Sequence, residues 1–141
     1  MGLIGVCLAL AAAAPASAPV FVPTDHFTLA WTHSIEKVRW EEDYAVVASA
    51  TPGQPPVLQA LTARVQGSAA GMEPPEDAVP RNGWYEYTPR MWSPKGLRLT
   101  RSVYTADYEW CSKGRCVALG QLLPSDGDIT LLTPCAQPAA R

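Results

Sequence analysis

The sequence predicts an all-β protein, a small antiparallel barrel or sandwich of about seven to eight short strands. Hydrophobic and polar residues alternate with a period of two along much of the chain, which is typical of half-buried strands. Fourteen prolines and ten glycines interrupt these segments, and both residue types disfavour helix interiors. The dipeptide Asn82-Gly83 is typical of a tight hairpin turn. No segment has a clear helical pattern.

Length and charge limit the classes of protein to consider. A chain of 141 residues holds one domain with one modest core, which we place at residues 25–135, followed by a disordered tail at 136–141. The formal net charge is −2, so the chain has no basic field that would attract nucleic acid or anionic lipid. Charged residues make up 17% of the chain, less than the usual share of about 25%.

The N-terminal segment has the composition of a signal peptide. Residues 2–22 carry no charge, and the apolar run ends in the small residues and prolines of Ala14-Pro-Ala-Ser-Ala18. A cleavage site of the A-x-A type fits there, after Ala16. We therefore expect residues 1–18 to be a signal peptide, or else an uncleaved anchor that just spans a bilayer. The domain would then lie in the periplasm, either free or anchored in the inner membrane.

The strands are expected in the following order. Phe27, Leu29, Trp31 and His33 share one face of the first strand, and the alternation resumes after a charged stretch at Tyr44, Val46 and Ala48. A turn at 51–56 leads to Val57, Gln59, Leu61, Ala63 and Val65 on one face of the next strand, where a short helix is the alternative. After an irregular loop at 67–75, further strands are predicted at 84–88, 97–103, in the pair within 108–119, and at 129–133.

The cysteines favour an oxidising compartment. A loop of four residues separates Cys111 from Cys116, so the two face each other across a hairpin at a distance that suits a disulfide. We predict that bond, with three buried thiols as the alternative. Cys135 is left unpaired, either free or bonded to a partner, and Cys7 is taken as an incidental residue of the signal peptide.

The stretch Trp31–Tyr44 is the densest in groups that can do chemistry. His33 either closes the core or points into a cleft at the end of its strand, and Glu36 could reach its ring across a turn. Together with Glu42 these residues are weak candidates for a metal site, because solvated charges beside a bend are commoner than ligands.

Catalytic motifs fit poorly. Ser34-Ile-Glu-Lys37 satisfies S-x-x-K, but the companion motifs of the penicillin-recognising enzymes are absent. His33 and Ser34 are adjacent on one predicted strand and point to opposite faces, which is poor geometry for a general base. Ser102 could meet His33 only across space. We expect no catalytic residue and no cofactor, and an enzyme is the less favoured hypothesis.

Several motifs resemble those of a known family. Trp31-Thr-His-Ser-Ile-Glu-Lys37, Trp40-Glu-Glu-Asp-Tyr44, Gly67-Ser-Ala-Ala-Gly-Met-Glu-Pro-Pro75, Leu97-Arg-Leu-Thr-Arg-Ser102 and Tyr104-Thr105 occur in this order. In this the chain is similar to the bacterial domain-of-unknown-function family 1850. Ala69 departs from the glycine often found in the third motif. The resemblance implies a small exported protein encoded beside the permease and solute receptor of a TAXI-type tripartite (TRAP) transporter, and supplies no catalytic assignment.

Two hypotheses follow. In the first, the chain is a periplasmic accessory or binding module for solute uptake, with a polar patch at one end of the barrel under a glycine-containing loop. In the second, it is a small hydrolase or metal-binding protein that uses His33 with Glu36 or Glu42. The candidate binding residues are Trp31, His33, Ser34, Glu36, Glu42, Gly67, Gly71, Met72 and Ser102.

Overall fold

A computed structural model describes residues 3–12, 19–32, 38–66, 78–89 and 94–137. These residues form eleven strands and a single turn of 3-10 helix. The prediction of an all-β fold is confirmed. The elements are β1 (Leu3–Leu10), β2 (Val20–Pro23), β3 (His26–Thr32), β4 (Arg39–Val47), β5 (Val57–Gln66), β6 (Val79–Arg81), β7 (Trp84–Tyr87), β8 (Leu97–Thr100), β9 (Glu109–Ser112), β10 (Arg115–Ala118), η1 (Leu119–Gln121) and β11 (Ile129–Gln137).

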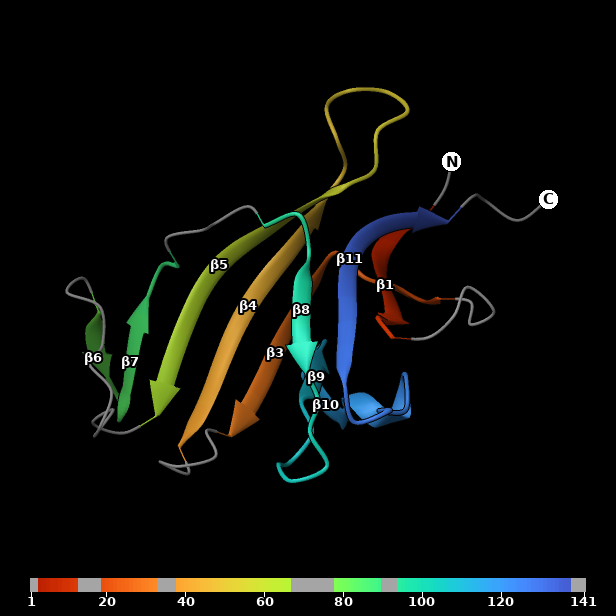
Figure 1. The fold of residues 1–141 in the computed structure, drawn as a ribbon. Coiled ribbons are helices and arrows are strands. Elements are labelled where there is room, and N and C mark those ends of the chain that lie inside the picture. Colours follow the sequence, from red (N-terminus) through yellow and green to blue (C-terminus); the bar gives the residue numbers. More distant parts are fainter. Residues whose placement is uncertain (1–2, 13–18, 33–37, 67–77, 90–93, 138–141) are drawn as a thin grey trace.

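The strands make two antiparallel sheets that pack face to face (Figure 1). The smaller sheet has four strands in the order β2-β1-β11-β8, and the larger has seven in the order β10-β9-β3-β4-β5-β7-β6. In the described part of the chain neither sheet closes on itself. Of the two predicted architectures, the fold is therefore the sandwich and not the barrel. The strand count exceeds the prediction, mainly because β1, β2 and β6 were not expected.

Side chains from both sheets fill one core. Phe27 lies at its centre, stacked between Tyr44 at a centroid distance of 5.2 Å and Trp110 at 4.5 Å. This agrees with the alternation that placed Phe27 and Leu29 on the buried face of their strand. The core cluster takes Val6, Leu8, Leu99 and Leu132 from the smaller sheet, Phe27, Leu29, Tyr44, Val46, Leu58, Ala60 and Trp110 from the larger, and Leu119 from η1.

The N-terminal segment is part of the sandwich. Residues 3–10 form β1, which pairs with β11 from Leu3↔Gln137 to Leu10↔Thr130. Val6 and Leu8 are fully buried. The sequence analysis had placed residues 1–18 outside the fold as a signal peptide; in the structure eight of them are a strand in the core. An apolar run of this length suits a buried strand as well as the hydrophobic stretch of a signal peptide, and periodicity does not distinguish the two.

Two disulfides close the fold. Cys111 and Cys116 face each other across the β9–β10 hairpin and are bonded, as predicted, with a Cα–Cα distance of 4.0 Å. Cys7 of β1 is bonded to Cys135 of β11, with a Cα–Cα distance of 5.9 Å. The expectation that Cys135 is unpaired and Cys7 incidental is therefore wrong. This expectation arose because the sequence analysis assigned residues 1–18 to a signal peptide and so left Cys7 out of the domain.

One buried face and two strand ends differ from the prediction. In β5 the buried residues are Leu58 and Ala60, then Ala63 and Val65, because the register with β4 shifts at a bulge near Leu61. The predicted face is thus wrong for the first half of this strand. β8 ends at Thr100, since Arg101 turns inward to an ion pair. β11 continues to Gln137, so the first two residues of the expected tail belong to a strand; residues 138–141 lie outside the described part.

The turns follow their sequence signals. Asn82 and Gly83 join β6 to β7 with φ values of 53° and 85°, the left-handed conformation of a tight hairpin turn. Lys113 and Gly114 do the same between β9 and β10, with φ values of 53° and 79°. Gly5 is required for another reason. A Cβ there would lie 2.1 Å from the carbonyl oxygen of Val22, so only glycine lets β2 pair so closely with β1.

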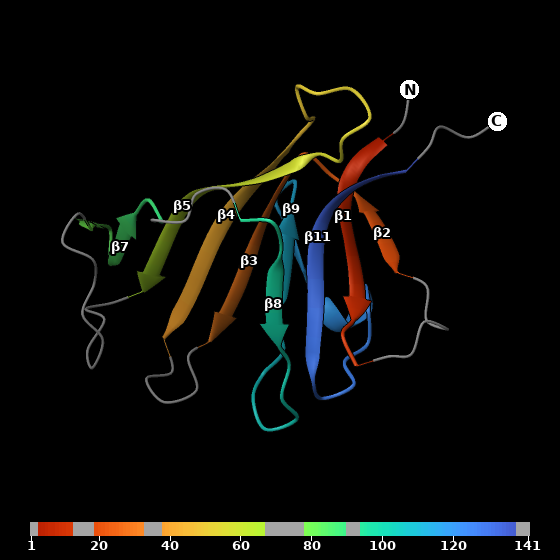
Figure 2. The same ribbon diagram turned by 45° about the horizontal axis from the view of Figure 1, so that its top comes forward.

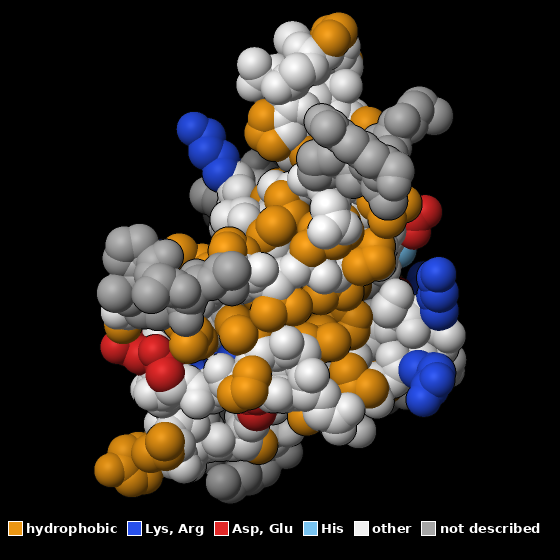
Figure 3. Space-filling model, turned by 90° about the vertical axis from the view of Figure 1, so that its right-hand side faces the viewer, with side chains coloured by type: hydrophobic (Ala, Val, Ile, Leu, Met, Phe, Trp, Pro, Cys, Tyr) orange, Lys and Arg blue, Asp and Glu red, His pale blue; other side chains and the backbone are white. Residues whose placement is uncertain are grey.

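The side of the molecule that carries β1 and β11 is largely apolar. Strands β1, β2 and β11 contain no Lys, Arg, Asp or Glu. Figure 3 shows hydrophobic side chains gathered across this face, with the charged side chains at its margins. Within the described ranges, no helix has the length and apolar character needed to cross a membrane.

Candidate binding site at the mouth of the sandwich

Several strand ends lie at one end of the sandwich. β3 ends at Thr32 and β4 begins at Arg39, and these residues pair with each other. β5 ends at Gln66, beside the first residue of β7. The C-terminal ends of β3, β5 and β8 point the same way, downward in Figure 1 and again in Figure 2. Residues 33–37 follow β3 and residues 67–77 follow β5, so both segments are joined to strands at this end, which we call the mouth.

Alternation along β4 sends its acidic residues to opposite faces. Glu42 and Tyr44 share the face that looks toward the smaller sheet, and Tyr44 is a core residue. Glu41 and Asp43 share the other face, which looks away from the core, and both contact Arg64 of β5 there. Glu42 is thus the acid of this strand that reaches the space between the sheets.

A cleft of about 240 Å³ opens between the sheets at the mouth. One wall comes from the larger sheet, with Glu42 between aliphatic and aromatic neighbours, and the other comes from β8. The apolar lining and single acidic group are typical of a site that orients a small polar ligand. The lining residues are Leu29, Trp31, Glu42, Leu97, Arg98, Leu99 and Tyr108.

Aromatic rings surround the acid. The ring centroids of Trp31 and Tyr108 are 5.8 Å apart, with the ring planes tilted by 54°. Those of Trp31 and Trp40 are 6.1 Å apart, with the planes nearly parallel. Trp31 and Tyr108 pack against the core and stay only partly buried. The indole Nε1 of Trp40 is buried and has no hydrogen-bond partner in the part of the chain that is described. The mouth therefore presents ring faces together with one carboxylate.

The Glu42 carboxylate is held in place by a tyrosine. The hydroxyl of Tyr44 donates a hydrogen bond of 2.7 Å to Glu42 Oε1. Burial raises the pKa of Tyr44 far above its usual value, and the negative charge of Glu42 adds to this effect, so the hydroxyl stays protonated and remains a donor. Burial likewise raises the pKa of Tyr108, again with a contribution from Glu42. Both hydroxyls therefore stay neutral, so neither tyrosine adds a negative charge to the cleft.

No described cation forms an ion pair with Glu42. The ion pairs of the described residues join Arg39, Arg64, Arg81, Arg101 and His26 to other acids. Arg98 lines the same cleft but is exposed on β8 and makes no described ion pair. Glu42 is thus a partly buried acid that accepts a hydrogen bond from a tyrosine hydroxyl and lines the cleft with aliphatic and aromatic side chains and Arg98.

A buried ion pair fixes the loop that follows β8. The Arg101 side chain is 1% exposed and donates two hydrogen bonds to Asp107, of 3.0 and 2.7 Å, and a third of 3.2 Å to Thr130 Oγ1. Although burial opposes ionisation of Asp107, the hydrogen bond and charge of Arg101 outweigh it and lower the pKa of that carboxyl. This clamp positions Tyr108, which directly follows Asp107, against the cleft.

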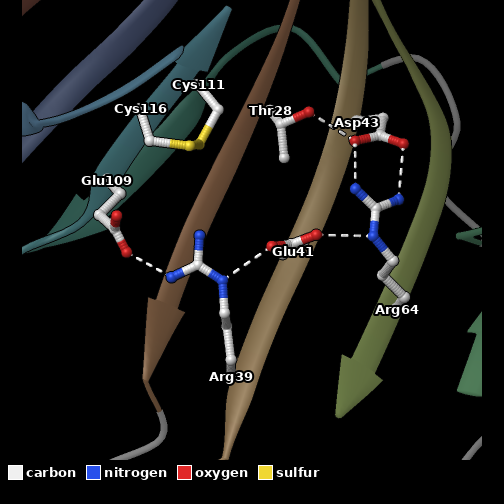
Figure 4. The surroundings of a disulfide bond; sticks show 8 residues. All are labelled: Thr28, Arg39, Glu41, Asp43, Arg64, Glu109, Cys111 and Cys116. Atoms are coloured by element: carbon white, nitrogen blue, oxygen red, sulfur yellow. Dashed lines mark hydrogen bonds and ion pairs between the residues drawn. A yellow bond between two sulfur atoms is a disulfide. The ribbon is translucent and has the colours of Figure 1, made fainter. Parts of the chain in front are cut away.

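A second charged cluster lies on the opposite face of the larger sheet (Figure 4). Arg64 donates to Glu41 at 2.6 Å and to both oxygens of Asp43, which also accepts a hydrogen bond of 2.6 Å from Thr28. Arg39 bridges Glu41 and Glu109. The cluster therefore ties β3, β4, β5 and β9 together, and each of these charges is satisfied by a neighbour.

A larger groove of about 580 Å³ lies over this cluster and beside the Cys111–Cys116 disulfide. Its charged lining includes Glu41, Asp43 and Arg64, which are already paired with one another. A ligand that binds Glu41, Asp43 or Arg64 would compete with these pairs, although Lys113 also lines the groove; a ligand at the mouth would meet an acid that has no described counter-ion. The smaller cleft is for this reason the better candidate.

The structure tests part of the predicted site. Of the predicted residues, Trp31 and Glu42 both line the cleft at the mouth. Ser102 lies in the loop after β8 and does not line the cleft; its hydroxyl accepts a hydrogen bond of 3.0 Å from the backbone N–H of Tyr104. Tyr44 and Tyr108 were missed as neighbours of the acid. The other predicted residues, His33, Ser34, Glu36, Gly67, Gly71 and Met72, lie outside the described residues.

A metal site of described residues is not found. No group of three or more His, Cys, Asp or Glu in the described ranges is arranged to hold a metal ion. Of the three weak candidates, Glu42 is described, and its Oε1 accepts the hydrogen bond from Tyr44.

The comparisons identify a family. The model of the family described as Domain of unknown function (DUF1850) matches residues 27–119. The match runs from β3 to the first residue of η1 and so covers the larger sheet, β8 and every residue that lines the cleft. No curated protein and no solved structure matches the chain.

Proposed function

We propose that this chain, which belongs to the family described as Domain of unknown function (DUF1850), is an exported, periplasmic binding module that assists solute uptake. Its binding site is the cleft at the mouth of the sandwich. The observation that carries this proposal is the cleft itself, in which Glu42 lies among aromatic side chains without a described counter-ion. A partly desolvated carboxylate with no described counter-ion is expected where a ligand supplies the positive charge.

Export is supported by the cysteines. Every described cysteine is in a disulfide, and disulfides form and persist in oxidising compartments. The bond between Cys7 and Cys135 requires that residues 3–10 stay with the domain. We therefore propose that the N-terminal segment serves as β1 in the exported protein, in place of a signal peptide that is removed after Ala16.

The partner is proposed from the family resemblance described above. That resemblance implies a link to TAXI-type TRAP transporters, and the component bound would be the permease or the solute receptor. The residues expected to contribute at the mouth are Trp31 and Glu42, together with His33 and Glu36 from the segment that joins β3 to β4.

Co-purification tests the proposal. The tagged protein is expected to retain the cognate permease or receptor in mild detergent, and Glu42→Gln is expected to weaken retention without changing the melting temperature by more than a few degrees. His33→Ala and Glu36→Ala should act in the same direction. Glu86→Gln is the matched control, because Glu86 lies on β7 and pairs with the exposed Arg81 at 3.5 Å. Failure to retain either component, or equal loss with Glu86→Gln, would refute the proposal.

A further inference from the structure

We propose that the cleft at the mouth binds the ammonium group of a small organic cation, with Glu42 as its counter-ion and aromatic rings as its walls. This inference rests on the proposed function, since it takes the mouth as the binding site and names the chemistry of the ligand.

The acid of the site, Glu42, favours a cation, although the exposed Arg98 also lines the cleft. Glu42 is the acid that lines the cleft, and its Oε1 is occupied by the hydroxyl of Tyr44. A carboxylate has about four lone-pair sites, and among the described residues only Tyr44 donates a hydrogen bond to Glu42. A tyrosine hydroxyl can stabilise the charge but cannot neutralise it. An alkylammonium would supply both a positive charge and, in a primary amine, three N–H donors.

The strand register concentrates aromatic rings around this acid. Glu42 pairs laterally with Leu29 on one side and with Ala63 on the other, and Ala63 pairs in turn with Tyr87. In the next row toward the mouth, Trp31 pairs with Trp40 and Trp40 with Val65, which pairs with Tyr85. Because paired residues lie on the same face of an antiparallel sheet, these rings share the face of Glu42. Tyr108 adds a ring from the loop before β9.

Aromatic faces attract organic cations. The π-system is negative on its face, and a cation within about 6 Å of the ring centroid is bound, most strongly by tryptophan. Trp31 and Tyr108 both line the cleft, with their centroids 5.8 Å apart and their planes tilted by 54°. An alkylammonium in the cleft would therefore meet two aromatic side chains and one carboxylate. A hydrated metal ion gains little from such walls, because it prefers several oxygen ligands.

The size of the cleft limits the ligand. Its volume of about 240 Å³ is below the range of about 300–1,000 Å³ usual for drug-sized molecules. The cleft suits a single alkylammonium head, whether that of a free amine or of a lysine side chain on a partner. Arg98 is the cation of the lining, and because it is exposed on β8 its charge is partly screened by solvent.

Titration with defined probes tests the inference. Choline, butylammonium and Nα-acetyl-lysine amide are added to the full chain, and binding is followed by calorimetry and by tryptophan fluorescence, with sodium chloride as the ionic-strength control. The neutral isostere of choline, 3,3-dimethyl-1-butanol, is the control for shape. We expect choline or butylammonium to bind at least tenfold more tightly than the neutral alcohol, and Glu42→Gln to remove at least tenfold of that affinity while Glu86→Gln does not.

The outcomes separate the possible sources and the two proposals. Binding of all three ammonium probes supports a free amine as ligand, and binding of the lysine derivative alone supports a side chain of the partner. If the neutral alcohol binds as tightly as the ammonium probes, or if Glu42→Gln has no effect on their binding, the inference is overturned. If no probe binds but retention of the transporter component still depends on Glu42, the ammonium inference fails and the proposed function stands.

Discussion

The two disulfides should contribute very differently to stability. Cys7 and Cys135 are 128 residues apart in sequence, whereas Cys111 and Cys116 are 5 apart. For loops of these lengths the chain-entropy estimate gives about 4.9 and about 2 kcal/mol, a difference of about 3 kcal/mol in the free energy of unfolding. For a chain of 141 residues this difference amounts to a melting-temperature gap of about 10 °C.

The comparison uses two double variants of the full chain, oxidised in vitro. Cys7→Ala with Cys135→Ala opens the long loop, and Cys111→Ala with Cys116→Ala opens the hairpin and serves as the matched control. Thermal unfolding is followed by circular dichroism, after mass spectrometry has confirmed the remaining bond in each variant. Equal losses of melting temperature, or a larger loss in the hairpin variant, would show that β1 is not anchored to β11 in the way described.

Three further predictions concern the N-terminus and the clamp. Gly5→Ala should lower the free energy of unfolding by about 1–3 kcal/mol, because its Cβ would lie 2.1 Å from the Val22 carbonyl oxygen; a denaturation midpoint equal to that of the unchanged chain would contradict this. Protein recovered from the periplasm should have the mass of a chain that contains Cys7 and two disulfides. The mass of a chain that begins at Ser17 would show that β1 is removed. Asp107→Asn should lower the free energy of unfolding by about 3 kcal/mol at neutral pH, because Arg101 then stays buried without its partner charge. Since the pKa of Asp107 is lowered in the folded state, its contribution is present above about pH 4, its ordinary pKa, and disappears as the pH falls through the folded value. Denaturant titrations should therefore show the two chains converging below pH 4, and a gap that stays constant there would be inconsistent with the clamp.

Local sequence predicted those parts of the fold that depend on local pattern. The alternation at Phe27 and Leu29 identified β3 and its buried face, and Asn82-Gly83 and the Cys111/Cys116 spacing identified two hairpins. These signals involve neighbours in the chain, where the period of two and the demands of a tight turn act directly.

Long-range partners could not be predicted in this way. β1 pairs with β11 at the other end of the chain, and no local pattern distinguishes such a strand from a signal peptide. The disulfide partner of Cys135 could not be predicted for the same reason, because Cys7 lies 128 residues away in the sequence. The bulge near Leu61 reversed the buried face of β5, because the register shift is set by pairing with β4.

The candidate site shows the same division. Trp31 and Glu42 were proposed because both lie in one charged and aromatic stretch, and alternation alone assigns Glu42 and Glu41 to opposite faces. Tyr44 was within reach of the same argument, two residues beyond Glu42. Tyr108 was not, because only the packing of the β8–β9 loop, fixed by Arg101, brings its ring to the mouth.

Site-specific photocrosslinking tests most directly whether the mouth is the binding surface. A benzophenone amino acid replaces Arg98, which is exposed and lines the cleft, or, as the control, Thr51, which is exposed in the turn between β4 and β5 at the opposite end of the larger sheet. We predict that in cells with the cognate TRAP transporter the label at position 98 joins the chain to the permease or receptor, and that Glu42→Gln reduces this product. Crosslinks from position 51 alone, or from neither position, would contradict the account.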